Sequence, residues 1–194
     1  ANLRGALLLN TKLDATDLSN AVINITGASL PEDIQRLLRE HALWIDSFGV
    51  MGTRADFAGR DLSGIDFGGA YLSGANLRSA NLTGAKLTGA FLVLADLEGA
   101  TLDEADLRRA DFAGASLKSS KIRHARLEDA RFDPTEIRSA AGGATGEDKR
   151  TDLSHASLRQ SALSGASLKL TNLRQGDLHG VIAEQTNFRG ADLS

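Results

Sequence analysis

The chain lacks cysteine, a long apolar run and an excess of charge of one sign. None of its 194 residues is cysteine, which excludes a disulfide framework and a thiolate metal site and leaves the redox compartment open. No apolar run approaches the length that spans a membrane, and the chain shows no secretory signal, so a cytoplasmic protein is expected. The net charge of -3 signals neither a nucleic-acid binder nor a strong polyanion.

An apolar residue recurs instead at every fifth position between Phe57 and Ile137. Two residues before each large residue stands a small one, usually Ala, and Gly dominates the position two residues after it. A helix repeats its buried face every 3.6 residues and a strand every two, so a period of five fits neither. This short repeat predicts a solenoid, in which each unit buries its apolar residues by stacking on its neighbours.

The repeated Ala-(Asp/Asn)-Leu-x-Gly units, such as residues 75–79 and 110–114, resemble the pentapeptide-repeat family. The resemblance extends over most of the chain. It implies an all-β solenoid, a right-handed quadrilateral β-helix of about eight coils with four pentapeptides in each coil.

The charged residues support four units per coil independently of this resemblance. With twenty residues per coil, residues twenty apart stack about 4.8 Å from each other on one side. All charged pairs at that offset in the densest region are complementary when His124 counts as basic: Glu98/Lys118, Asp103/Arg123, Glu104/His124, Asp106/Arg126, Arg108/Glu128, Arg109/Asp129 and Asp111/Arg131. An offset of fifteen or twenty-five would instead place like charges together, which is unfavourable across paired strands.

The periodicity divides one solenoid domain into five segments. We expect N-terminal coils over 1–30, a helical insertion over 31–53, the central solenoid over 54–137, an exposed loop over 138–151 and C-terminal coils over 152–194. The loop is expected because its segment holds no large apolar residue. The chain starts without Met and both of its ends fall inside a repeat, so a fragment of a longer protein is expected.

A helix is predicted over residues 31–47. Pro31 suits the first turn of a helix, and the acids Glu32 and Asp33 suit its positive end. Its apolar residues follow helical spacing: Ile34, Leu37, Leu38, Trp44, Ile45 and Phe48. This apolar stripe either packs on the solenoid, on a side or at a coil end, or binds a partner.

The sequence predicts no catalytic, cofactor-binding or metal-binding residue, and hence no enzyme. The four His residues are scattered and show no metal-ligand spacing. A narrow coil filled by its own side chains leaves no pocket for paired carboxylates in acid–base chemistry. The many Asp residues that precede a large residue are expected on solvated faces and in turn hydrogen bonds.

One outward apolar cluster departs from the repeat. Tyr71, Phe91, Val93 and Leu94 stand where the pattern usually places polar residues and Gly. Exposed patches of this kind mark contacts. The cluster is therefore the candidate interaction patch, unless the 31–48 helix or the 138–151 loop covers it.

The leading hypothesis is a non-catalytic scaffold or protein-interaction module of bacterial pentapeptide-repeat type, with an unidentified protein partner. The resemblance also implies an alternative, a DNA mimic that inhibits or protects DNA gyrase like the family's quinolone-resistance members. Such mimicry requires a strongly negative surface, whereas the acids here are cancelled by Arg and Lys. No direct binding of nucleic acid or membrane and no cofactor is expected, and uncapped coil ends or an exposed face would allow homo-oligomers.

Overall fold

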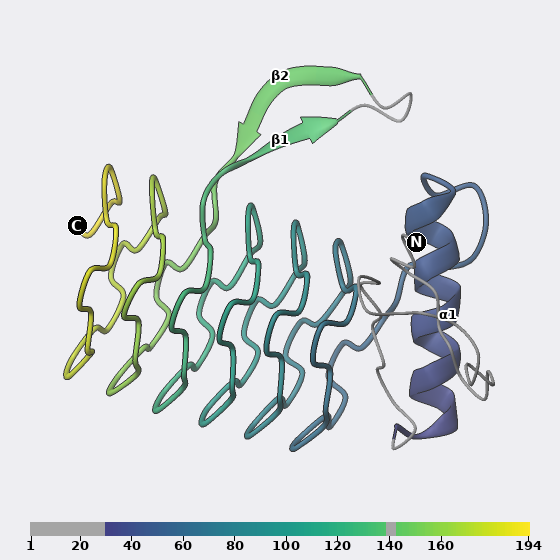
Figure 1. Ribbon diagram of the computed structural model, residues 1–194, viewed down its shortest axis with the longest axis horizontal. Helices are drawn as coiled ribbons and strands as arrows, with labels where there is room; N and C mark the ends of the chain where they lie inside the picture. The colour runs from purple at the N-terminus through teal and green to yellow at the C-terminus, as the bar shows by residue number, and fades with distance from the viewer. Residues whose placement is uncertain (1–29, 139–142) are drawn as a thin grey trace, which may run out of the picture.

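The computed structural model describes residues 30–138 and 143–194, and the predicted coils of 1–30 lie outside this part apart from Leu30. Stacked coils form a rod, helix α1 (Glu32–Asp46) stands across one end of it, and a hairpin of β1 (Thr135–Arg138) and β2 (Ala144–Lys149) projects from it (Figure 1). The helix predicted over 31–47 is thereby confirmed. In the described part, no helix combines the length and apolar character needed to cross a bilayer.

Parallel bridges join each coil to the next, between residues that are twenty apart except where the hairpin is inserted. Four ladders of such bridges begin at Asp56, Asp61, Asp66 and Tyr71, and these define the first to the fourth side of the rod. The first side, for example, continues from Asp56 through Asn76, Asp96, Ser116, Asp152, Asn172 and Asp192. The predicted right-handed quadrilateral β-helix with four pentapeptides per coil is therefore confirmed.

The interior of the rod holds one large and one small residue from each side. Leu and Phe at the centre of the repeats, and Ala two residues earlier, are almost fully buried from the first described coil to Leu173. In the last coil Leu178, Phe188 and Ala191 are only partly buried, and Leu193 is exposed. Phe112 and Phe132 stack inside the rod, with ring centroids 4.9 Å apart and planes at 3°. A slot this narrow leaves no space for a second large side chain, which explains the recurrence of Ala.

Each corner is a β-turn whose third residue has a positive φ, as at Gly59 (φ 65°). The large residue accepts the hydrogen bond that closes the turn, from Arg60 N–H to Phe57 O at 3.1 Å in the first coil. Asp56 Oδ1 accepts the Ala58 N–H at 3.0 Å within the same turn. The predicted role of the repeat Asp residues in turn hydrogen bonds is confirmed at this and several further corners.

The ion pairs follow the predicted register only in part. Arg123 pairs with Asp103, and Arg131 pairs with Asp111 at 2.9 Å, across adjacent coils as predicted. Arg78 pairs with Glu98 at the same offset of twenty. Other charges pair differently: Arg78 also with Asp96, Arg108 with Asp106, and Arg126 with Glu128. Exposed side chains of this length choose among several partners, so sequence offset predicts which backbones are adjacent better than which charges meet.

The expectation of a loop over 138–151 is wrong in its secondary structure, because β1 and β2 pair as an antiparallel hairpin with Thr135 opposite Lys149. The bridge from Ser116 leads to Asp152, an offset of 36 instead of 20, so an insertion of sixteen residues interrupts one coil. Pro134 stands at the corner where the other coils need a positive φ, which its ring forbids. The coil therefore ends here, and Ile137, predicted to continue the core, lies in β1 instead.

Candidate interaction surface

The structure brings the predicted patch together on the fourth side of the rod. Tyr71 and Phe91 are bridge partners in adjacent coils, and their rings stack with centroids 4.9 Å apart and planes at 5°. Phe91 remains 37% exposed and Leu94 41% exposed, while Tyr71 and Val93 are half-buried. These four residues are called the apolar patch below.

Leu94 occupies an unfavourable backbone conformation. It stands at a corner with a φ of 59°, a conformation that costs a side chain other than glycine about 1–3 kcal/mol and that further corners such as Glu104 and His124 share. A Cβ added at Gly114 would lie 2.9 Å from Leu94 Cδ2 and 2.7 Å from Thr135 Cγ2. Leu94 therefore leans over Gly114, against the base of the hairpin.

Helix α1 flanks the patch on the other side. A Cβ added at Gly74, the corner that follows Tyr71, would lie 3.4 Å from the Trp44 ring. Of the predicted helix residues, Ile34 and Leu38 are buried in the core and Leu37 packs against it. Trp44 and Ile45 are half-buried, and Phe48 is 78% exposed. The helix thus covers a coil end with part of its apolar stripe only, and neither it nor the hairpin covers Phe91 and Leu94.

Three polar ties hold α1 to the coils. Asp33 near its start pairs with Arg60, which together with the backbone around Asp33 holds the pKa of the carboxyl below its usual value. His41 Nδ1 accepts the Ala55 N–H at 3.1 Å. Thr53 N–H donates to the Glu40 carbonyl at 3.2 Å. Since no side chain caps the start of α1, these ties and the apolar contacts fix its position.

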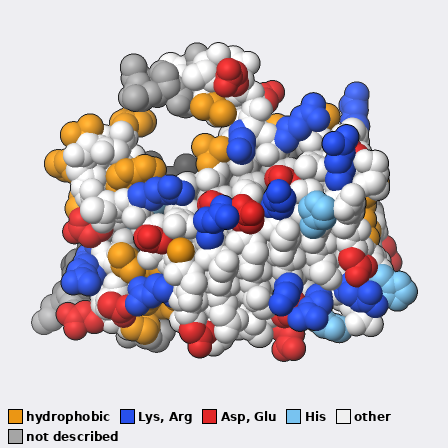
Figure 2. Space-filling view, turned by 180° about the vertical axis from the view of Figure 1, so that it is seen from behind, with side chains coloured by type: hydrophobic (Ala, Val, Ile, Leu, Met, Phe, Trp, Pro, Cys, Tyr) orange, Lys and Arg blue, Asp and Glu red, His pale blue; other side chains and the backbone are white. Residues whose placement is uncertain are grey.

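An opening lies beneath the hairpin, between it, the end of α1 and the rod, and apolar side chains border this opening (Figure 2). The turn after α1 carries three strongly exposed apolar residues, Phe48, Val50 (85%) and Met51 (58%). Sequence reasoning singled out Phe48 but missed Val50 and Met51. The sequence did indicate them, since Val50 and Met51 are two apolar residues that directly follow Gly49 and belong to no repeat.

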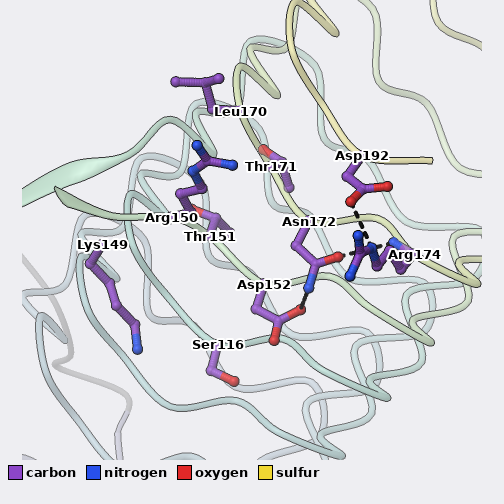
Figure 3. Close-up of a pocket in the computed structure, with 10 residues that line it drawn as sticks. All are labelled: Ser116, Lys149, Arg150, Thr151, Asp152, Leu170, Thr171, Asn172, Arg174 and Asp192. Carbon is purple, nitrogen blue, oxygen red and sulfur yellow. Dashed lines mark hydrogen bonds and ion pairs between the residues drawn. The ribbon is translucent and has the colours of Figure 1, made fainter. Parts of the chain in front are cut away.

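A second hollow, on the first side beside the return strand of the hairpin, is polar (Figure 3). Arg174 pairs with Asp192 at 2.6 Å, and Asn172 donates to Asp152 at 2.9 Å. The buried Thr151 hydroxyl bonds the Phe112 carbonyl at 3.0 Å. These groups are engaged with each other or with the backbone, so none is poised as a nucleophile or base.

In the described part of the chain, no group of three or more His, Cys, Asp or Glu residues could hold a metal ion.

The family model described as pentapeptide repeats matches residues 53–89, 92–129 and 151–190, in eight copies. The comparison with curated proteins gave no match.

Similar solved structures include the pentapeptide repeat protein Rfr23 of the cyanobacterium Cyanothece 51142, at 18% identity and a TM-score of 0.42, covering 84% of this chain and 99% of that one. The fluoroquinolone resistance protein QnrB1 is 18% identical with a TM-score of 0.34, covering 72% and 91%. A pentapeptide repeat protein from the thylakoid lumen of Arabidopsis thaliana is 25% identical with a TM-score of 0.28, covering 71% and 63%.

Proposed function

The chain belongs to the pentapeptide-repeat family, and on this premise we propose that it is a non-catalytic interaction module that binds a protein partner through the apolar patch. The supporting observation is the outward aromatic stack of Tyr71 and Phe91 beside Leu94. Aromatic side chains with exposed faces are the residues that most often dominate protein interfaces. A rigid rod keeps them in place without a partner, which lowers the entropy cost of binding.

The exposed position of Leu94 also supports this proposal. The equivalent corners of the neighbouring coils carry Gly74 and Gly114, so the fold itself accepts glycine at this position. A leucine there costs backbone energy and leaves apolar surface in water. Other corners share the positive φ, among them Leu170 (φ 57°) on the same side, so the support comes from the exposed apolar surface of Leu94 beside the aromatic stack.

We predict that Phe91→Ala weakens the association with the partner by about thirtyfold, which corresponds to a central interface residue worth about 2 kcal/mol. The measurement is a titration of the partner that the wild-type protein retains from a lysate of its source cells. Ile182→Ala is the matched control, because Ile182 is also exposed (56%) but lies on the third side in a distant coil. Equal affinity of wild type and Phe91→Ala would refute the proposed surface.

The alternative, a DNA mimic directed at gyrase, has less support in the charge distribution. Duplex mimicry needs a row of unpaired negative charges spaced like phosphates. Here Asp103 and Asp111 pair with Arg123 and Arg131 along the rod. A gyrase supercoiling assay separates the two functions, since a mimic inhibits at micromolar concentration and an interaction module of the proposed kind leaves supercoiling unchanged.

A further inference from the structure

We propose that α1 is a proton-sensitive latch, which stays docked on the coil end while His41 is neutral and detaches when the imidazole takes up a proton. The coils themselves stay folded when the latch opens. Detachment uncovers the apolar end of the rod that Leu30, Ile34 and Leu38 cover in the docked state.

The hydrogen bond of His41 requires a neutral ring. The imidazole is completely buried and its Nδ1 atom accepts the Ala55 N–H, so the ring proton resides on Nε2. A second proton would have to sit on Nδ1, where it would face the Ala55 N–H donor to donor. Protonation therefore turns one of the three polar ties of α1 into a repulsive contact.

The surroundings of His41 offer the charged ring little compensation. Nε2 is buried and makes no well-formed hydrogen bond among the described residues. Burial lowers the pKa of His41 to about 4; the nearby Ser73 backbone opposes this shift in part, and the positive charge of Arg54 adds to it. On its own helix the ring stacks on Trp44, with centroids 5.5 Å apart, which supplies no negative charge.

The described coils, over residues 54–134 and 151–194, contain no comparable group in their interior. Their buried residues are almost all apolar, with a few hydroxyls such as those of Ser120, Thr151 and Ser161 that do not titrate in this range. Each coil is also bonded to its neighbours along four sides, whereas α1 rests on one end of the rod. Helix and coils are thus expected to open as separate cooperative units.

The pH range follows from the two states of the histidine. The pKa is lower in the docked state than its ordinary value of 6.5, so docking is at full strength above pH 6.5 and weakens as pH falls toward about 4. At pH 5 the opening equilibrium of α1 is expected to rise about twentyfold over that at pH 7.

Amide hydrogen exchange of the whole chain, corrected for the intrinsic rate at each pH, tests this prediction. Protection of peptides from α1 should fall about twentyfold between pH 7 and pH 5, while protection of peptides from residues 75–130 should not change. Emission of Trp44, the single tryptophan, should shift to the red over the same range.

Two variants isolate the role of His41. His41→Asn keeps an acceptor for the Ala55 N–H but cannot titrate, so protection of α1 should become independent of pH. Asp33→Asn removes the ion pair with Arg60 and should weaken docking. Because the pKa of the Asp33 carboxyl lies below its usual value of 3.8, this group does not titrate between pH 7 and pH 5, so the change over that range should persist.

Three results would overturn the latch. Protection of α1 that is equal at pH 7 and pH 5 would show that the histidine does not control docking. The same pH dependence in His41→Asn would assign the effect to another group. Simultaneous loss of protection in α1 and in the coils would show that acid unfolds the rod as a whole.

Discussion

Replacing Phe112 by Ala is expected to lower the free energy of unfolding by about 3–5 kcal/mol, which is the usual cost of removing a large buried aromatic ring. Phe112 is completely buried and stacks on Phe132 in the next coil. Because the slot is closed on four sides by hydrogen-bonded backbone, it cannot collapse into the cavity. Urea unfolding followed by far-UV circular dichroism measures the change.

Phe112→Leu is the matched control, since Leu fills the same position in most coils. It removes the stack but keeps an apolar side chain, so a loss below about 1.5 kcal/mol is expected. If the Ala and Leu variants were equally stable, the ring would not be part of a tightly filled core.

Gly52→Ala is expected to dislodge α1 at a cost of about 3 kcal/mol, combining backbone strain with overlap. Gly52 has a φ of 69°, and a Cβ there would overlap the Glu40 carbonyl oxygen and lie 2.8 Å from Leu43 Cβ. The chain passes this close to the helix because the next residue, Thr53, donates to the same carbonyl. Thermal unfolding and the exposure of Trp44 to acrylamide quenching report the effect.

Gly59→Ala separates strain from overlap. Gly59 has a nearly equal φ of 65°, but a Cβ there would meet nothing within 4 Å. Only the strain of about 1 kcal/mol should remain, and Trp44 should stay as protected as in the wild type. Equal effects of the two substitutions would contradict the close approach of helix and chain at Gly52.

The rod was predictable because the packing that stabilises it is the same in every coil. Each side of a coil needs one large residue, one small residue and a corner residue, so core positions such as Leu77 and Ala75 are recognised by their spacing alone. The complementary charges twenty residues apart predicted the number of residues per coil. The bridge between Asp106 and Arg126 confirms this offset, even though these two residues form no ion pair. Backbone register is fixed by the coil, whereas a long exposed side chain chooses its own partner.

The hairpin was not predicted, although Pro134 carried a signal for it. A residue locked at negative φ cannot form a corner that needs positive φ, so the array has to stop there. Apart from Ile137, the residues that follow are small or polar, and their pairing as β1 and β2 depends on contacts that no repeat encodes.

The surface on which α1 packs could not be predicted from the sequence either. Its apolar stripe predicts that the helix is covered, but two surfaces compete for it, the coil end and a partner. The choice depends on contacts between segments with no shared period, such as His41 with Ala55 and Trp44 with Gly74. The apolar patch was predictable for the same reason as the rod, since Phe91 and Leu94 break a pattern whose meaning is known.

Disulfide formation between engineered cysteines tests the four-sided coil most directly, because the chain contains no cysteine of its own. Asn81 and Thr101 are bridge partners on the second side, and strands about 4.8 Å apart fit the geometry of a disulfide. The pair Asn81→Cys with Thr101→Cys should therefore oxidise rapidly, while Asn81→Cys with Asp96→Cys or with Asp106→Cys should stay reduced. Rapid oxidation of either of these two pairs, with none at the twenty-residue offset, would contradict four pentapeptides per coil.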